Sequence, residues 1–380
     1  MNLIYFGYYC DNQLFSRINT QDSYKLSQAR QNFEELILMG LSQSFPDIDI
    51  YSYLPTKRGR KIESYSSIND KIIKLYKVDK NNPFSNIYNL LKILFLVAKF
   101  PRKSSIIMYA INPLFMIPLI ILRPFKKFEI TTICSELPQF RRGKENYFTR
   151  VKHKIQSFYN RKFDKYILIT HLMKDVIPVK NKPYLVIEGM VPYQEKVPKI
   201  ARSNDIMYAG ALTPDNLIIN FIEASLRSLL VDKILIFGEG PEEKRIKKLA
   251  ETHNKIVFFG YKKREEILEY EKSVGVLISL RNIEDSISKY AFPSKLMEYM
   301  LSGTLILSTK IEGIPDEYDQ FIDFTENVEP NSLAKKIDDI LSLDDETYFY
   351  KSLRQQDFIL EQKNFLVQTL KIAKLINTDR

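Results

Sequence analysis

The sequence of 380 residues has no tryptophan, three histidines and only two cysteines, Cys10 and Cys134. Two cysteines can form neither a disulfide framework nor a cysteine-rich zinc site, and this usage is typical of a reducing compartment. The histidines His153, His171 and His253 lack the spacing of metal ligands. We therefore expect a cytoplasmic protein without a metal site built on cysteine or histidine.

The chain also lacks an apolar run long enough to span a membrane. Its first residues, MNLIYFGYYCDNQ, have neither the basic start nor the apolar core of a signal peptide. The most apolar segments, 87–100 and 111–128, are shorter than the roughly 20 residues of a transmembrane helix. We expect buried helices of an α/β domain at both places. A helix lying on the membrane is the alternative, because cations lie at the margins of these segments: Lys99, Arg102, Lys103, Arg123, Lys126 and Lys127.

Acidic residues are scarce in the first half of the chain. Residues 1–200 contain 32 Lys and Arg against 16 Asp and Glu, and residues 201–380 contain 24 against 30, so the halves carry +16 and −6 of the net +10. A basic half predicts an anionic partner such as nucleic acid, a membrane surface or a phosphate-bearing substrate. No nucleic-acid recognition motif accompanies the charge, and the aromatic and basic residues of 51–80 fit a mobile acceptor loop equally well.

Short apolar runs alternate with helical patterns along the chain. This alternation is typical of parallel sheets covered on both faces, and the length suits two domains. We expect an α/β fold of two Rossmann-like, doubly wound domains facing each other across a cleft. Their predicted boundaries are 1–192 for the first domain, 193–204 for a polar linker, 205–350 for the second domain, and 351–380 for a helical segment that could cross back to the first.

Glycines follow several predicted strands of the second domain. Gly210, Gly238 and Gly260 each stand where a strand gives way to a turn, and glycine alone is ordinary there. Together they line the carboxyl edge of one sheet, which is where such sheets bind ligands. The stretch GEGPEE (238–243) is not a dinucleotide fingerprint, because Glu243 occupies the place of the third glycine.

The stretch YAFPSKLMEYMLSG (290–303) predicts a helix that begins near this edge and ends at Gly303. Ser294, Lys295 and Glu298 share one face of it, because residues three and four apart are neighbours on a helix. The free N–H groups and positive end of the helix favour an anion. We therefore predict a nucleoside diphosphate site, with Lys295 on the phosphates and Glu298 accepting hydrogen bonds from ribose hydroxyls. A solvated helix start with an ion pair is the plain alternative.

Four segments of the second domain, taken together, carry a resemblance. YAGALTPDNLI (208–218), IFGEGPEEKRIKKLA (236–250), IVFFGYKKREEI (256–267) and FPSKLMEYMLSGTLILSTKIEGIPDEY (292–318) are similar, in order, to landmarks of the retaining glycosyltransferases of family 4, also called glycosyl transferases group 1. The resemblance implies the GT-B fold and is closest to bacterial enzymes that build capsule, exopolysaccharide or O-antigen. It covers about 205–320 well and the first half only in pattern.

The resemblance implies a role for individual residues. Glu298 matches the second glutamate of the E-x(7)-E motif, which holds the ribose, and Gly210 matches the glycine near the β-phosphate. Tyr261 matches the region that contacts the base. The expected donor-binding set is Gly210, Ala211, Gly238, Gly260, Tyr261, Arg281, Tyr290, Ala291, Phe292, Pro293, Ser294, Lys295 and Glu298.

The sequence also departs from the family pattern. The first glutamate of the motif falls on Tyr290, and the usual Arg and Lys of the first glycine loop fall on Ala211 and Asn216. Those two cations normally neutralise the leaving diphosphate, and a missing cation costs rate. Lys295, with Arg281 or Lys289, would have to replace them, and a weak or inactive enzyme stays open.

In the first half, ITTICSELPQFRRGK (130–144) lies where family members place a group near the reacting sugar. Glu136 is the catalytic candidate there, beside Lys295 in the second domain, although an ordinary exposed glutamate is an equal alternative. Arg141 and Arg142 could meet the phosphates of an acceptor.

The resemblance thus implies transfer of a sugar, with retention, from a nucleotide sugar of the UDP type to a lipid-linked or oligosaccharide acceptor. We expect no cofactor beyond this donor, and no metal is needed if the helix dipole and Lys295 neutralise the phosphates. The basic first half predicts peripheral contact with an anionic membrane at its cytoplasmic face, and no nucleic acid. The alternatives are a sugar-nucleotide epimerase or phosphorylase on the same fold, and a non-catalytic partner of an active homologue.

Overall fold

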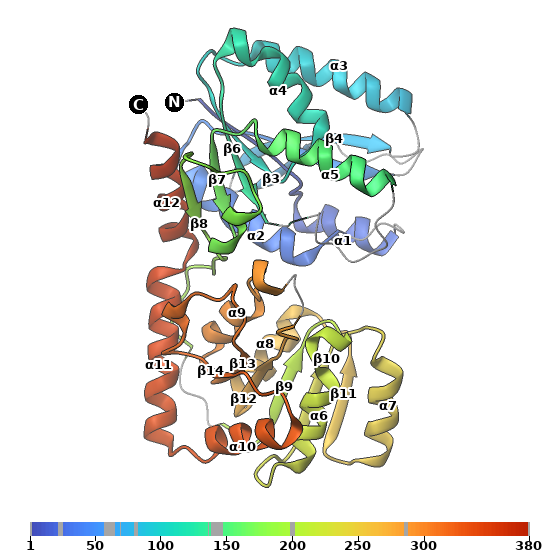
Figure 1. The fold of residues 1–380 in the computed structure, drawn as a ribbon, viewed down its shortest axis with the longest axis vertical. Helices are drawn as coiled ribbons and strands as arrows, with labels where there is room; N and C mark the ends of the chain where they lie inside the picture. The colour runs from blue at the N-terminus through green and yellow to red at the C-terminus, as the bar shows by residue number, and fades with distance from the viewer. Residues whose placement is uncertain are drawn as a thin grey trace. The chain divides into compact units, whose positions relative to one another are not determined.

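The computed structural model describes residues 2–21, 26–56, 65–68, 70–79, 83–135, 137, 147–197, 202–284 and 288–378. The chain forms two compact units (Figure 1). The first contains Met1–Pro192 together with Phe365–Arg380, and the second contains Tyr193–Asn364. Within the described ranges, each helix is too short or too polar to span a bilayer.

The first unit is built on an eight-stranded sheet in the order β3-β4-β2-β1-β5-β6-β7-β8. Neighbouring strands are parallel except for β3 and β4. The strands are β1 (Leu3–Gly7), β2 (Asp49–Thr56), β3 (Tyr65–Ile68), β4 (Lys71–Asp79), β5 (Ser105–Tyr109), β6 (Glu129–Cys134), β7 (Lys165–Leu168) and β8 (Tyr184–Val186).

Helices cover both faces of this sheet, because its central strands are apolar on both sides. Tyr5 belongs to the core that α2 and α12 close, whereas the next residue, Phe6, lies 4.5 Å from Phe115 between ring centroids. Successive residues of a strand point to opposite faces, so α3 and α4 cover the second face. The helices are α1 (Asn12–Gln21), α2 (Gln28–Ser44), α3 (Pro83–Lys99), α4 (Pro113–Lys126), α5 (Tyr147–Asn160) and α12 (Phe365–Asn377), with a 3-10 turn, η2 (His171–Asp175).

A buried carboxylate organises the turn after β1. Oε1 of Glu34, on α2, accepts hydrogen bonds from the Tyr8 amide at 2.7 Å and the Tyr5 hydroxyl at 3.1 Å. A Cβ at Gly7 would lie 1.7 Å from the same oxygen, so only glycine leaves room for this carboxylate. Burial raises the pKa of Glu34 to about 7, although its hydrogen-bond donors act in the opposite direction.

The segment 51–80 contains strands. In sequence its aromatic and basic residues fitted a nucleic-acid surface and a mobile acceptor loop equally well, but β3 and β4 occupy the described residues 65–68 and 71–79. Strand β4 pairs in parallel with β2 from Ile50↔Ile73 to Thr56↔Asp79. Ile73 and Leu75 are buried while Lys74 between them is half-buried, which is the two-residue period of a strand. The basic and aromatic pattern therefore reflects the two faces of a strand.

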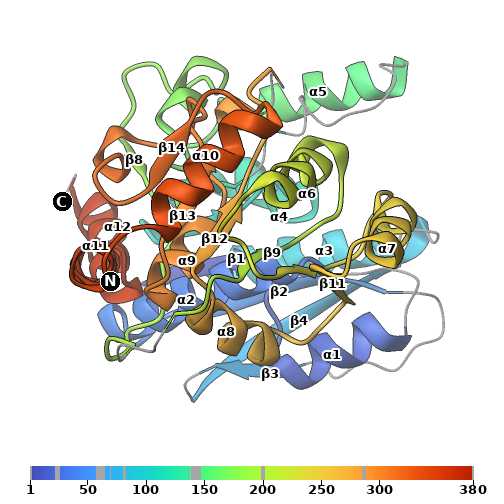
Figure 2. The same cartoon turned by 90° about the horizontal axis from the view of Figure 1, so that it is seen from below.

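The second unit has a six-stranded parallel sheet in the order β11-β10-β9-β12-β13-β14. Helices α8 and α9 lie on one side of it, and α6 and α10 pack together on the other (Figure 2). The strands are β9 (Ile206–Ala209), β10 (Ile234–Phe237), β11 (Ile256–Gly260), β12 (Val276–Ser279), β13 (Ile306–Thr309) and β14 (Asp323–Thr325). The helices are α6 (Ile218–Arg227), α7 (Glu243–Thr252), α8 (Arg264–Ser273), α9 (Lys295–Ser302), α10 (Pro330–Leu341) and α11 (Asp345–Gln362).

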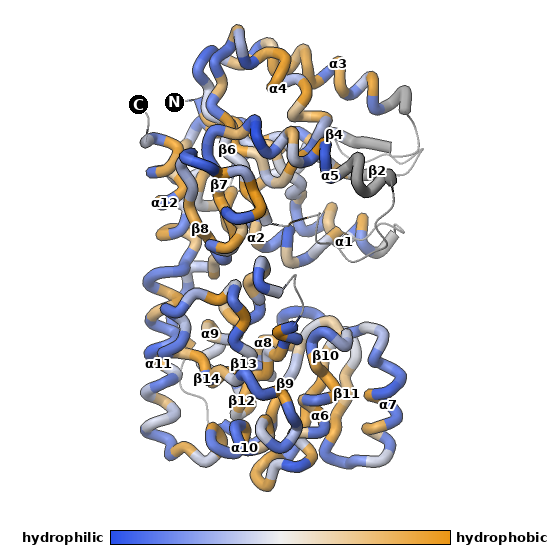
Figure 3. Tube along the Cα trace, viewed as in Figure 1, coloured by the Kyte–Doolittle hydropathy of each residue, from blue (hydrophilic) through white to orange (hydrophobic). Residues whose placement is uncertain are grey.

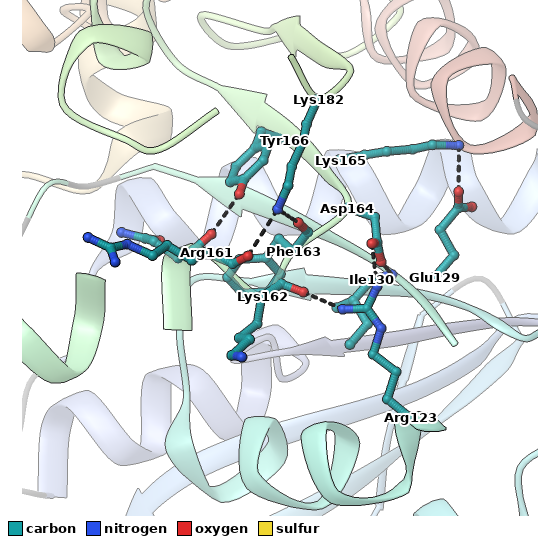
Figure 4. Close-up of polar contacts among 11 residues, drawn as sticks. Arg123, Glu129, Ile130, Arg161, Lys162, Phe163, Asp164, Lys165, Tyr166 and Lys182 are labelled. Atoms are coloured by element: carbon teal, nitrogen blue, oxygen red, sulfur yellow. Dashed lines mark hydrogen bonds and ion pairs between the residues drawn. The ribbon is translucent and has the colours of Figure 1, made fainter. Parts of the chain in front are cut away.

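The end of the chain returns to the first unit. Helix α11 packs on α9 in the second unit, and after Lys363 and Asn364 helix α12 packs on α2 and β8 in the first. The buried ammonium of Lys165 donates to the Ile376 carbonyl at 3.3 Å. It also pairs with Glu129 at 2.9 Å (Figure 4). A cation at the carboxyl end of a helix is stabilising, so this contact fixes the last turns of α12.

Candidate functional site

Three glycines meet at the carboxyl edge of the second unit's sheet, as the sequence predicted they would lie. The Gly210 amide donates to the Phe237 carbonyl at 3.0 Å, and the Gly238 amide donates to the Gly260 carbonyl at 2.9 Å. Gly210 and Gly238 directly follow the neighbouring strands β9 and β10, and Gly260 is the last residue of β11. A Cβ at Gly238 would lie 1.8 Å from the Gly210 carbonyl oxygen, so the turns touch backbone to backbone. At these three positions the edge of the sheet therefore consists of backbone atoms alone.

Helix α9 is attached to this same edge. The buried hydroxyl of Tyr299 accepts a hydrogen bond from the Ala209 amide at 3.1 Å and lies 3.3 Å from the Ala209 carbonyl. The helix begins at Lys295 after Ser294 and ends at Gly303, whose φ of +81° suits glycine. Tyr299 therefore holds the helix beside the end of β9, one turn away from Lys295.

Four charged side chains gather on the first turn of α9 and on α8. Lys295 Nζ lies 3.0 Å from Oε2 of Glu298, and Arg264 Nε lies 2.7 Å from its Oε1. Lys295 also lies 3.6 Å from Oε1 of Glu271. The cluster thus joins two cations to two carboxylates, and only Glu271 is completely buried, with an exposed fraction of 0%.

The two carboxylates of this cluster differ in their electrostatics. Burial raises the pKa of Glu271 to about 7, with Lys295 offsetting part of the effect. Burial also acts to raise the pKa of Glu298, but Lys295 and Arg264 outweigh it and lower the pKa. Neither oxygen of Glu271 has a hydrogen-bond partner among the described residues. Glu298 therefore loses its proton more readily than Glu271, which burial holds toward its neutral form.

The loop after β9 contains no cation but has one nearby. The Ala211 carbonyl accepts hydrogen bonds from the Tyr208 hydroxyl at 2.8 Å and from Nδ2 of Asn216 at 2.6 Å. Burial raises the pKa of Tyr208 to about 12, and the charge of Arg281 opposes this rise. The Asn282 amide also donates to the Asp215 carbonyl at 2.9 Å. The loop after β12 thus brings Arg281 to the loop that contains Ala211 and Asn216, where the resemblance implies two cations.

Residues 290–294, which lead into α9, include both buried and exposed side chains. Phe292 and Pro293 are buried, and the Phe292 ring packs 5.2 Å from that of Tyr318. Ala291 and Ser294 are exposed, and a Cβ at Gly313 would lie 2.2 Å from the Ala291 carbonyl oxygen. Tyr290 lies at the end of a 3-10 turn, η4 (Ser288–Tyr290), and Tyr261 is 70% exposed just after Gly260.

The structure thus places the expected donor-binding residues in the second unit, at one sheet edge and the adjoining helix start. Arg264 and Glu271 were missed, although Glu271 falls where the helical period after Ile267 calls for an apolar residue. Glu136, Arg141 and Arg142 lie outside the described residues. Among the described parts of the chain, no group of His, Cys, Asp and Glu side chains has the arrangement of a metal site.

The second unit matches the model of a known family. Residues 192–356 match the family model described as "Glycosyl transferases group 1". The match covers 193–356 of a unit that ends at Asn364, and less than half of the whole chain. None of the curated proteins matches the sequence.

Solved structures match the whole chain. The galactosyltransferase WaaB of the lipopolysaccharide outer core aligns at a TM-score of 0.66 with 13% identity, over 100% of both chains. HepE of Anabaena in complex with UDP-glucose aligns at 0.64 with 12% identity, also over 100% of both chains. Sucrose-phosphate synthase of Thermosynechococcus elongatus aligns at 0.68 with 14% identity, over 100% of this chain and 99% of its own. At this identity the likeness shows the fold, which is that of GT-B glycosyltransferases.

Proposed function

We propose that the protein is a retaining glycosyltransferase of family 4 that uses a UDP-sugar donor. The observation that carries this proposal is the cluster of Lys295 and Glu298, on the first turn of α9, with Arg264 of α8, next to the glycine-lined edge of the sheet. This unit matches the glycosyl transferases group 1 family, and a solved structure of the same fold binds UDP-glucose. Base, diphosphate and sugar would lie along this edge.

Glu298 would bind the ribose while staying paired with its cations. Each of its oxygens accepts one hydrogen bond here, from Arg264 or Lys295, and a carboxylate oxygen has a second lone pair for a ribose hydroxyl. The lowered pKa of Glu298 keeps it ionised and so able only to accept. Tyr261, which is exposed after Gly260, would contact the base.

Lys295 and Arg281 would stabilise the leaving diphosphate in place of the two absent cations. The amides of the first turn of α9 add to this positive potential. In the transfer, the bond from C1 of the sugar to the diphosphate oxygen breaks and a bond from C1 to the acceptor oxygen forms on the same face. The acceptor hydroxyl proton passes to an oxygen of the leaving diphosphate, so no metal is required by this scheme.

The first unit would bind the acceptor, a lipid-linked or free oligosaccharide of bacterial surface polysaccharide synthesis such as capsule, exopolysaccharide or O-antigen. We assign residues 1–192 to it, 193–204 to the linker and 205–350 to the donor domain. Glu136 would act beside the reacting sugar, and Arg141 and Arg142 on acceptor phosphates. The net +16 of residues 1–200 favours work at the cytoplasmic face of an anionic membrane.

A non-catalytic partner of an active homologue is the second candidate. The observation that favours it is the loop after β9, where Ala211 and Asn216 supply no charge and Asn216 is used to hold the loop itself. A pure scaffold would keep its function in cells when Glu298 is replaced by Gln, whereas an enzyme would lose it.

The first experiment is calorimetric titration with UDP, GDP, CDP and ADP in the absence of metal, using the wild type and Lys295→Ala. Binding of UDP that weakens at least tenfold in the variant supports the donor site. Lys248→Ala, at an exposed position on α7, is the matched control and should bind like the wild type. Binding of none of the four nucleotides would refute the proposal.

A further inference from the structure

Helices α3 and α4 of the first unit present apolar side chains on their outer face as well as on the buried one. Ile87, Leu91 and Phe95 follow one another at the four-residue spacing of one helix face, and they are 56%, 60% and 66% exposed. Phe125, near the end of α4, is 71% exposed. The sequence predicted buried helices here, and this is correct only for the inner face, where Ile93 and Val97 have no exposed surface.

This outer face is unusual within the molecule. Of the eighteen large hydrophobic residues that are exposed in the described chain, six lie on these two helices: Ile87, Tyr88, Leu91, Phe95, Ile121 and Phe125. Single exposed apolar residues are normal, but grouped ones mark an interaction surface. Figure 3 shows the hydrophobic colour on both helices at the outside of the first unit.

The charge around this face has one sign. Between Asp79 and Glu129 the sequence contains no acidic residue, while it contains eight Lys and Arg. Lys92, Lys99, Arg102, Lys103 and Lys127 are exposed, and the Lys99 ammonium lies 4.4 Å from the centroid of the Phe95 ring. Lys99 thus lies beside an aromatic side chain of this face, and the segment that forms the face carries net positive charge.

The two helices are held together from inside, so their outer residues are not needed for that purpose. The Lys103 amide donates to the Lys126 carbonyl at 2.8 Å, and Lys126 Nζ donates to the Phe100 carbonyl at 2.7 Å. Arg123 turns inward to pair with Asp164 and donates to the Lys162 carbonyl at 2.6 Å (Figure 4). These hydrogen bonds therefore hold the cationic ends of α3 and α4 next to each other.

We propose that the outer face of α3 and α4 is a membrane-docking surface, in which Ile87, Tyr88, Leu91, Phe95, Ile121 and Phe125 enter the headgroup region of an anionic bilayer. Aromatic and aliphatic side chains among lysines are the pattern of a helix lying in the membrane interface. A second copy of this chain fits less well, because two such faces would bring like charges together. The surface deepens the proposed function, since it would place the acceptor unit where lipid-linked acceptors lie.

Vesicle flotation of the full-length protein tests this surface. We expect the wild type to float with vesicles of phosphatidylcholine and phosphatidylglycerol and to bind pure phosphatidylcholine much more weakly. Leu91→Gln with Phe95→Gln should lower the partition coefficient roughly tenfold or more, because two exposed apolar side chains are lost. Lys99→Glu with Lys103→Glu should also lower it at least roughly tenfold, since each basic residue near the surface contributes to binding.

Matched controls lie in the second unit. Leu229→Gln with Tyr350→Gln removes two side chains that are 89% and 61% exposed, and Lys244→Glu with Lys248→Glu reverses two charges on α7. Both controls should float like the wild type. Equal binding by the α3 variants, an equal loss in the controls, or no flotation of the wild type would overturn the proposal. A wild-type dimer in light scattering that Leu91→Gln with Phe95→Gln converts to a monomer would overturn it too, in favour of an interface between copies.

UDP titration without vesicles separates this inference from the proposed function. The α3 variants should bind UDP like the wild type, which also shows that they fold. Flotation without nucleotide binding would refute the donor site and leave the docking surface intact. UDP binding without flotation would refute the docking surface and leave the donor site intact.

Discussion

Lys295 Nζ lies 3.6 Å from Oε1 of Glu271, a carboxylate that has no exposed surface. This acid, on α8, lies beside the cation that we assign to the diphosphate. With Glu271 ionised, the cluster of Arg264, Lys295, Glu271 and Glu298 is neutral; with Glu271 protonated, it carries one positive charge. The protonation of Glu271 therefore sets how strongly this site attracts an anion.

Replacement of Glu271 by Gln should make nucleotide binding less dependent on pH. The pKa of Glu271 is raised to about 7, so the carboxyl is neutral at lower pH and gains a negative charge as pH rises through this value. In the wild type, UDP affinity should fall across that range, whereas in Glu271→Gln it should stay nearly level. Titration calorimetry at a series of pH values measures this. A wild-type decline that persists unchanged in the variant would assign the titration to another group, such as the nucleotide itself.

Glu298→Gln should weaken UDP binding by about ten- to a hundredfold, because hydrogen bonds to a charged acceptor contribute about 1.5–3 kcal/mol. The variant also leaves Arg264 and Lys295 without their shared carboxylate. Uridine lacks the phosphates but keeps the ribose, so its binding should weaken as well. Binding of uridine and UDP by calorimetry distinguishes a ribose contact from a purely structural role. An unchanged affinity for uridine would remove Glu298 from the ribose site.

The second unit was largely predictable from sequence, because its signals are local. Gly303 ends α9 in the left-handed conformation that the sequence predicts, and the apolar runs mark the strands. Glu271 and Arg264 were missed because their meeting with Lys295 depends on how α8 packs beside α9, which no spacing along the chain reveals. In the first unit, β4 was missed because its basic residues resemble a loop until the partner strand is known.

The buried carboxylate of Glu34 should make the protein less stable as pH rises. Its pKa in the folded chain is about 7, above the ordinary value of 4.5. The folded state therefore holds this proton more tightly, so its stabilising effect is complete below about pH 4.5 and is lost as pH rises to about 7. The loss is of the order of 3 kcal/mol.

Glu34→Gln should flatten that dependence, since Gln cannot ionise and can still accept from the Tyr8 amide. Urea unfolding at several pH values measures the free energy for both proteins. Glu35→Gln, on the neighbouring position of α2, is the control and should keep the wild-type slope. If Glu34→Gln shows the same slope as the wild type, the titration belongs elsewhere, with Glu271 the next group to test.

Two glycines of the donor edge offer a matched test of backbone strain. Gly238 has a φ of +131° and lacks space, because a Cβ would lie 1.8 Å from the Gly210 carbonyl oxygen. Gly238→Ala should therefore cost about 3 kcal/mol or more and disturb the turn that faces the donor. Gly260 has a φ of +67° but open space, with the nearest side-chain atom 4.0 Å from a Cβ. Gly260→Ala should cost only about 1–2 kcal/mol, the price of a left-handed residue.

Urea unfolding measures both costs, and UDP titration measures what remains of the site. We expect Gly238→Ala to lose more stability than Gly260→Ala and to weaken UDP binding, because the turns after β9 and β10 touch through their backbones and must move together. An equal loss of unfolding free energy in the two variants would mean that the backbone of the turn after β10 shifts easily to make room for a Cβ. In that case the glycine-lined edge would not be rigid. The contacts that bind the diphosphate would then have to come from α9 alone.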